Sequence, residues 1–135
     1  MDGLRIAVIL PCYNEEAAIG ATIAGFRAAL PTANIFVYDN NSRDRTTEVA
    51  RSAGAIVRAE RQQGKGHVVR RMFADVDADV YVLVDGDATY DAPSAPRMID
   101  ALRVFTTEFE SMVRGGKDGA TMARETNAKI DALVS

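Results

Sequence analysis

The chain has 135 residues, 47% of them hydrophobic, which is enough for one domain with a substantial core. The net charge of −3 gives no basic surface of the kind that holds nucleic acid, so we expect no nucleic-acid partner. A single cysteine excludes an intrachain disulfide and is typical of the reducing cytoplasm, where we expect the protein to act.

Apolar, β-branched stretches alternate with segments of helical periodicity along most of the chain. We predict strands at 4–10, 34–38, 55–59 and 80–84, with helices between them. This alternation predicts right-handed βαβ units and therefore an α/β three-layer sandwich with a mostly parallel, Rossmann-like sheet. The run at 80–84 consists of five β-favouring residues, so we expect it to be buried on both faces of the sheet.

The predicted helices have recognisable ends. Asn14 is a suitable N-cap for the first helix, which would place Glu15 and Glu16 in its first turn, and Ser42 is a suitable cap for the second. A Gly-Lys-Gly segment at 64–66 precedes the third helix. Residues 103–135 are predicted to form a helical tail, separate from a first domain at 1–102.

Unusual polar residues follow the predicted strands at the ends where open parallel sheets bind ligands. They fall at 13–16, at 39–44, and at Asp85 and Asp87. Asp85 and Asp87 are two residues apart in extended chain, so both point to one side and offer hard oxygen ligands to Mg²⁺ or Mn²⁺. Gly86 between them leaves room for a ligand to approach the backbone. The alternative is a polar turn with two solvated aspartates.

Other side chains near the strand ends have a binding interpretation, and for some of them a structural one is also open. Asp39 follows an apolar strand and can accept a hydrogen bond from a nucleotide base, or form an Asx turn leading to Ser42. Lys65 can meet a diphosphate as a point charge at a helix start. Glu15 and Glu16 can equally be surface acids, and Cys12 is expected to be a buried apolar residue.

Together these segments resemble the N-terminal half of a family 2 glycosyltransferase of the GT-A nucleotide-sugar fold. The segment at 9–19 resembles that family's first-strand signature, and 38–46 its second, although Asn40 and Asn41 stand where the pattern usually has Asp and Gly. Gly64-Lys65-Gly66 resembles the diphosphate-side loop, and Asp85-Gly86-Asp87 the metal-binding D-x-D. The run 85–99 is most similar to the polyprenyl-phosphate and dolichyl-phosphate sugar transferases.

The resemblance implies inverting, metal-dependent transfer of a sugar from a nucleoside-diphosphate sugar to an acceptor, with polyprenyl phosphate at the membrane surface as one candidate. It implies that Asp39 holds the base, that Asp85 holds the ribose or the metal, and that Asp87 is the catalytic metal ligand at the diphosphate. It implies nucleotide contacts from Pro11, Tyr13, Asn14, Glu16, Asp39, Asn41, Lys65 and Asp85, and metal ligation by Asp85 and Asp87.

Residues 103–135 depart from the family pattern, and we expect the acceptor half of the family to be missing, truncated or replaced in this chain. We therefore expect a shortened GT-A sheet, and self-association to cover its exposed edge and apolar surface. A non-catalytic or half-length nucleotide-sugar-binding domain is the main alternative function. A nucleotidyltransferase lacks support because 11–16 contains no glycine, and a phosphoacceptor receiver domain would place its acids and lysine differently.

Overall fold

The computed structural model describes residues 3–135, so residues 1 and 2 of the predicted first domain lie outside it. Contacts divide the chain into two compact units, the first ending at Pro93 and the second spanning Ser94–Ser135. The boundary that we predicted between residues 102 and 103 falls inside helix α4 (Ala95–Val113). A functional division into 1–102 and 103–135 therefore stays a prediction.

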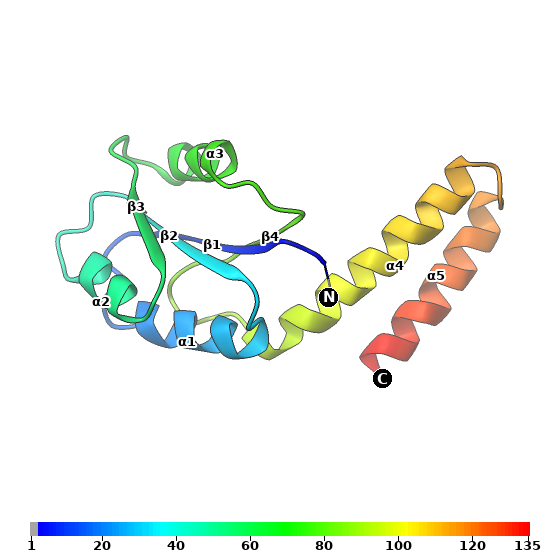
Figure 1. Ribbon diagram of the computed structural model, residues 1–135, viewed down its shortest axis with the longest axis horizontal. Helices are drawn as coiled ribbons and strands as arrows, with labels where there is room; N and C mark the ends of the chain where they lie inside the picture. The colour runs from blue at the N-terminus through cyan, green and yellow to red at the C-terminus, as the bar shows by residue number, and fades with distance from the viewer. Residues whose placement is uncertain (1–2) are drawn as a thin grey trace. The chain divides into compact units, whose positions relative to one another are not determined.

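The first unit is built on a parallel sheet, which within the described residues has four strands in the order β3-β2-β1-β4 (Figure 1). The strands are β1 (Ile6–Cys12), β2 (Asn34–Asp39), β3 (Ile56–Ala59) and β4 (Val80–Leu83). In the register of the sheet, Ile9 lies between Phe36 and Leu83. The predicted α/β fold with parallel strands is confirmed, with strand ends shifted by up to two residues.

One prediction about the sheet is wrong. The strand at 80–84 is not buried on both faces: β4 pairs only with β1 among the described strands, and Leu83 is 42% exposed. The strands buried on both faces are β1, where Val8, Ile9 and Leu10 are each 0% exposed, and β2, where Val37 and Tyr38 are also 0% exposed. An unbroken apolar run indicates burial of the strand but does not show how many strands will pair with it.

Helices cover both faces of this sheet (Figure 1). On one face lie α1 (Ile19–Ala29) and α2 (Thr46–Ser52), and on the other lies α3 (Lys65–Asp75). Side chains alternate along the strands, so Ile9 and Phe36 pack with Val68 and Met72 of α3. The result is the expected three-layer sandwich. A short 3-10 helix, η1 (Ala92–Ser94), follows β4.

The helices begin later than the capping pattern predicts, except for α3. α1 starts at Ile19 rather than after Asn14, and α2 starts at Thr46 rather than after Ser42. Asn14 instead adopts a left-handed φ of 51°, which asparagine tolerates in loops. α3 starts at Lys65, inside the Gly-Lys-Gly segment, with Gly64 before it at φ 126°. Cap-forming residues were present, but they serve loops between strands and helices.

The second unit is a hairpin of α4 and α5 (Gly119–Val134), which lie side by side (Figure 1). Asp118 caps α5 by accepting a hydrogen bond from the Thr121 N–H at 2.9 Å. Glu108 of α4 is only 4% exposed and forms ion pairs with Lys117, at 2.5 Å, and with Lys129. Lys117 also pairs with Glu125. Charged groups therefore help to connect the two helices, together with the buried side chain of Met122.

Another surface of α4 is apolar. Met98, Leu102, Phe105, Phe109 and Val113 are each 45–70% exposed and recur at intervals of three or four residues. The rings of Phe105 and Phe109 stack with centroids 6.1 Å apart. We call this set the apolar stripe. In the described part of the chain, no helix combines the length and hydropathy that a bilayer-spanning segment needs.

Candidate functional site

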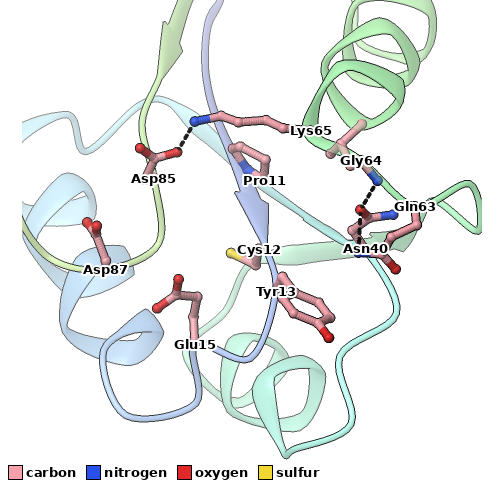
Figure 2. A pocket seen from close by; sticks show the side chains of 11 residues that line it. Pro11, Cys12, Tyr13, Glu15, Asn40, Gln63, Gly64, Lys65, Asp85 and Asp87 are labelled. Atoms are coloured by element: carbon pink, nitrogen blue, oxygen red, sulfur yellow. Dashed lines mark hydrogen bonds and ion pairs between the residues drawn. The ribbon is translucent and has the colours of Figure 1, made fainter.

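The carboxyl ends of β1, β2 and β4 open into a pocket of about 310 Å³ (Figure 2). That volume is at the lower end of the range for small-molecule sites. The pocket is lined by Pro11, Cys12, Tyr13, Glu15, Asn40, Gln63, Gly64, Lys65, Val68, Asp85 and Asp87. Five of the predicted site residues are thus brought together: Pro11, Tyr13, Lys65, Asp85 and Asp87.

Three carboxylates surround one part of the pocket. Figure 2 shows Glu15 and Asp87 directed toward the same space, with Asp85 beside them. Thr89 holds Asp87, whose Oδ1 accepts from the Thr89 hydroxyl at 2.6 Å and from its N–H at 3.2 Å. The hydroxyl bond lowers the pKa of Asp87, whereas burial, together with Asp87 and Asp85, raises the pKa of Glu15.

Lys65 crosses the pocket from the start of α3 to Asp85. Its Nζ donates to Asp85 Oδ1 at 2.5 Å, and this bond raises the pKa of Lys65 (Figure 2). The hydroxyl of Tyr90 lies 3.5 Å from the other oxygen of Asp85. The pocket therefore places one cation among acids, which is an arrangement suited to a polyanion accompanied by a metal ion.

Asp39 is buried, with only 7% of its surface exposed. Its Oδ2 accepts from the Ser42 N–H at 3.0 Å, which is the turn that the structural interpretation predicted. Its Oδ1 is buried and has no hydrogen-bond partner among the described residues. An unpaired buried acceptor is costly, so this oxygen has hydrogen-bonding capacity that the described protein groups do not use. Asp39 does not line the pocket as delimited above.

The remaining predicted residues, Asn14, Glu16 and Asn41, do not line the pocket either. Asn14 accepts from the Arg43 N–H at 2.9 Å, and Glu16 accepts from the Arg45 N–H at 3.2 Å. Asn41 donates to the carbonyl of Arg61 at 2.9 Å. These side chains connect the loops that follow β1, β2 and β3. In this structure they therefore support the loops around the pocket without lining it.

Asn40 is the principal residue that the sequence analysis missed. Its amide donates to the carbonyls of Glu60 and Gln62, both at 2.8 Å, and its Oδ1 accepts from the Gly64 N–H at 2.8 Å. Asn40 thereby fixes the segment that leads into Lys65. Its departure from the usual family pattern was visible in the sequence, but the partners of its amide lie 20 to 24 residues away, and these contacts were not visible.

Gly86 has a different role from the one we expected. A Cβ at this position would lie 2.6 Å from the Sγ of Cys12 and 3.1 Å from Cδ1 of Ile19. The absent side chain thus makes room for Cys12 and α1, not for a ligand. Cys12 itself is 3% exposed, as predicted, and burial raises its pKa to about 12. The close approach of β1 to 85–87 sets where the two aspartates stand.

Glu15, Gln63, Gly64 and Val68 also line the pocket without having been selected. Glu15 was weighed both as a strand-end site residue and as a surface acid, and Gln63 and Val68 belong to no strand end. Their sequence neighbourhood, next to Asn14 and Lys65, was the available signal.

The donor set fits a hard divalent cation by its chemistry, because Asp85 and Asp87 supply carboxylate oxygens and Mg²⁺ commonly takes only one or two carboxylates together with substrate phosphates. Within the described residues, no three His, Cys, Asp or Glu side chains gather closely enough to form a complete ligand set. Asp85 is engaged by Lys65. The fit therefore requires oxygens from a diphosphate.

A parallel sheet of this strand order, with acids at the strand ends around one pocket, is typical of GT-A-like α/β domains. The chain belongs to glycosyl transferase family 2, whose sequence profile matches residues 7–127. It is 61% identical over 98 residues to Protein RfbJ of Shigella flexneri, an alignment that covers 73% of this chain and 76% of that protein. It is 35% identical to a dolichyl-phosphate hexose transferase of Haloferax volcanii, covering 72% of this chain and 42% of the relative.

Solved structures confirm the fold. Glucosyl-3-phosphoglycerate synthase from Mycobacterium tuberculosis, in complex with Mn²⁺, UDP and phosphoglyceric acid, superposes with a TM-score of 0.67 at 28% identity. The match covers 74% of this chain and 39% of the synthase. The chain thus spans most of RfbJ but less than half of the other two relatives.

Proposed function

We propose that the chain binds a nucleoside-diphosphate sugar together with Mg²⁺ or Mn²⁺ and transfers the sugar, with inversion, to an acceptor. The observation that carries this proposal is the single pocket in which Lys65, Asp85 and Asp87 meet beside the unpaired buried oxygen of Asp39. Family membership supports the reaction class. The synthase that shares the fold binds Mn²⁺ and UDP, which supports the choice of ligands.

In this proposal Asp39 accepts a hydrogen bond from the base, and Asp85 and Asp87 hold the metal next to the diphosphate. The bound metal would neutralise charge that develops on the departing diphosphate. Thr89 keeps the Asp87 carboxylate oriented and ionised. Pro11 and Tyr13 line the adjoining part of the pocket, whereas Asn14, Glu16 and Asn41 act on the nucleotide through the loops that they connect.

We propose polyprenyl phosphate as the acceptor, on the strength of the dolichyl-phosphate relative. A phosphate oxygen is already anionic, so the acceptor needs no strong general base. With such an acceptor the chain would act in the cytoplasm, peripheral to the membrane surface. A non-catalytic nucleotide-sugar binder is the second candidate, and it is favoured by the ion pair through which Lys65 engages Asp85, one of the two proposed metal ligands.

We further propose that the chain forms a homo-oligomer through the apolar stripe of α4. Residues 94–135 contain six basic and six acidic side chains, so this unit has no electrostatic preference for an anionic bilayer. The stripe runs along most of α4, so the same stripe on a second copy matches it in length and in apolar chemistry. This self-complementarity favours a second copy as the partner.

Calorimetric titration of a panel of nucleoside diphosphates, with and without Mn²⁺, tests the binding proposal. Asp39→Ala should weaken binding roughly tenfold or more in both conditions, because a charge-assisted hydrogen bond contributes about 1.5–3 kcal/mol. Asp87→Asn should reduce only the metal-dependent part. Asp77→Asn is the matched control, since Asp77 pairs with Arg5 and does not line the pocket.

Absence of binding by the unaltered chain to every nucleotide in the panel would overturn the proposal. Unchanged affinity of Asp39→Ala would assign Asp39 to the Ser42 turn alone. Release of the nucleoside diphosphate from its sugar conjugate, dependent on polyprenyl phosphate, separates the enzyme from the binder: binding without such release supports the second candidate.

A further inference from the structure

Lys65 occupies the position at Asp85 where a cation is needed. The ammonium group lies 2.5 Å from Asp85 Oδ1, and Asp87 also contributes attraction to it. Glu15 lies on the same side of the pocket (Figure 2). The lysine therefore balances part of the negative charge that three neighbouring carboxylates create.

We infer that Lys65 is an internal counterion, which competes with the divalent cation for Asp85 and releases it when a diphosphate enters the pocket. This inference rests on the proposed function, and it adds an order of events to it. The metal binds weakly to the free protein, because Lys65 both occupies Asp85 and repels the ion. A diphosphate draws the lysine away, so the metal and the nucleotide bind together.

The backbone around Lys65 is held in place, so only the Lys65 side chain has to move in this exchange. Gly64 is fixed through its N–H to Asn40 Oδ1, and α3 is anchored by Val68 and Met72, which are 1% and 0% exposed. The four methylene groups of Lys65 are the mobile part between this fixed base and the acid. The side chain needs only to change rotamer in order to leave Asp85 for a phosphate.

The Lys65–Asp85 pair is also weak enough to be exchanged. The side chains are 61% and 38% exposed, and ion pairs of that exposure contribute little net stability because water screens them. A diphosphate carries several charges and offers more acceptors than one carboxylate. The equilibrium therefore moves toward the phosphate as soon as the nucleotide is bound.

The test measures Mn²⁺ binding without nucleotide, by electron paramagnetic resonance, and UDP binding without metal, by calorimetry, with GDP as a second probe. Lys65→Met should strengthen Mn²⁺ binding roughly tenfold, the scale of one charge–charge interaction near a protein surface, and weaken UDP binding by a similar factor. Lys65→Arg should keep Mn²⁺ binding weak. Arg70→Met, which removes an exposed charge from the same helix outside the pocket, should change neither.

Opposite shifts in the two affinities support the inference, because a variant with a damaged fold would weaken both. Equal Mn²⁺ affinities for the unaltered chain and Lys65→Met would overturn it, even if Mn²⁺ binds normally in the presence of UDP, and the proposed function would then stand. Failure of the unaltered chain to bind Mn²⁺ with either nucleotide present would overturn both.

Discussion

The two units of this chain distribute polarity in opposite ways. In the sheet unit, Val8, Ile9 and Leu10 are fully buried, and charged groups gather at one rim of the sheet. In the α4–α5 hairpin, a glutamate and its lysine partners lie between the helices, while the apolar stripe is exposed. The sheet unit has the pattern of a self-sufficient fold. The hairpin has an exposed apolar surface, which is the pattern of an element that contacts another molecule.

The contrast also separates two sources of order. Apolar burial gives the sheet unit its stability, so its polar residues can be placed for binding. The hairpin depends on geometry among charges, since Lys117 and Lys129 converge on one carboxylate of α4. Ion pairs specify an arrangement more than they stabilise it. Four experiments sharpen or break this comparison.

The largest effect is expected from the core. Ile9→Ala should lower the free energy of unfolding by about 2–5 kcal/mol, because it leaves a cavity in a fully buried layer. Phe105→Ala in the apolar stripe should change the free energy of unfolding of the monomer by no more than about 0.5 kcal/mol. Urea denaturation at low protein concentration measures both.

Phe105→Ala should instead act on association. Light scattering at tens of micromolar should show assemblies of the unaltered chain and a shift toward the monomer for the variant. A strict monomer of the unaltered chain would contradict the proposed pairing of stripes. A core-sized loss of stability for Phe105→Ala would show that the stripe is covered within one chain.

A medium effect is expected where β1 meets the acid pair. Gly86→Ala should lower the free energy of unfolding by about 1–3 kcal/mol, since the Cβ of the alanine would lie 2.6 Å from the Cys12 Sγ. Gly66→Ala is the matched control, because a Cβ there has no heavy atom within 4 Å and the residue lies within α3. It should be stabilising by roughly 0.5–1 kcal/mol. Thermal or urea unfolding that ranks the two alike would contradict the close packing.

The smallest effect concerns pH and the hairpin. The two lysines lower the pKa of Glu108 from 4.5 to about 2. A carboxyl group with a lowered folded-state pKa contributes stability that is fully present above about 4.5 and is lost as the pH falls toward 2. Circular dichroism should therefore show a loss of helical signal as the pH falls over that interval. In the Glu108→Gln variant the helical signal should depend less on pH. Glu110→Gln is the control. Equal pH profiles for the unaltered chain and Glu108→Gln would contradict the role of the cluster.

Local pattern was sufficient for the sheet but not for its order. Each strand is apolar along its own length, so 4–10 and 34–38 were predicted closely. The edge position of β4 depends on which strands exist to pair with it, and periodicity carries no such information. The cap predictions for Asn14 and Ser42 failed for a related reason: their hydrogen bonds go to distant loops instead of the next helix.

The site was predicted where residues project from strand ends, as at Asp85, Asp87 and Tyr13. It was missed where a side chain acts across loops, as at Asn40, or where a glycine serves packing instead of access, as at Gly86. Both depend on contacts between segments far apart in the sequence. Only the folded chain brings those segments together.

The contact between Cys12 and Gly86 gives the protein a reporter of its own motion. The chain has one thiol, and it lies buried beneath the loop that carries both pocket aspartates. Its raised pKa keeps it protonated and unreactive while that loop is in place. Any local opening of 85–87 exposes the sulfur, so its rate of alkylation follows the opening equilibrium. A ligand that clamps the aspartates would therefore be recorded as a slower reaction at this thiol, which itself lines the pocket.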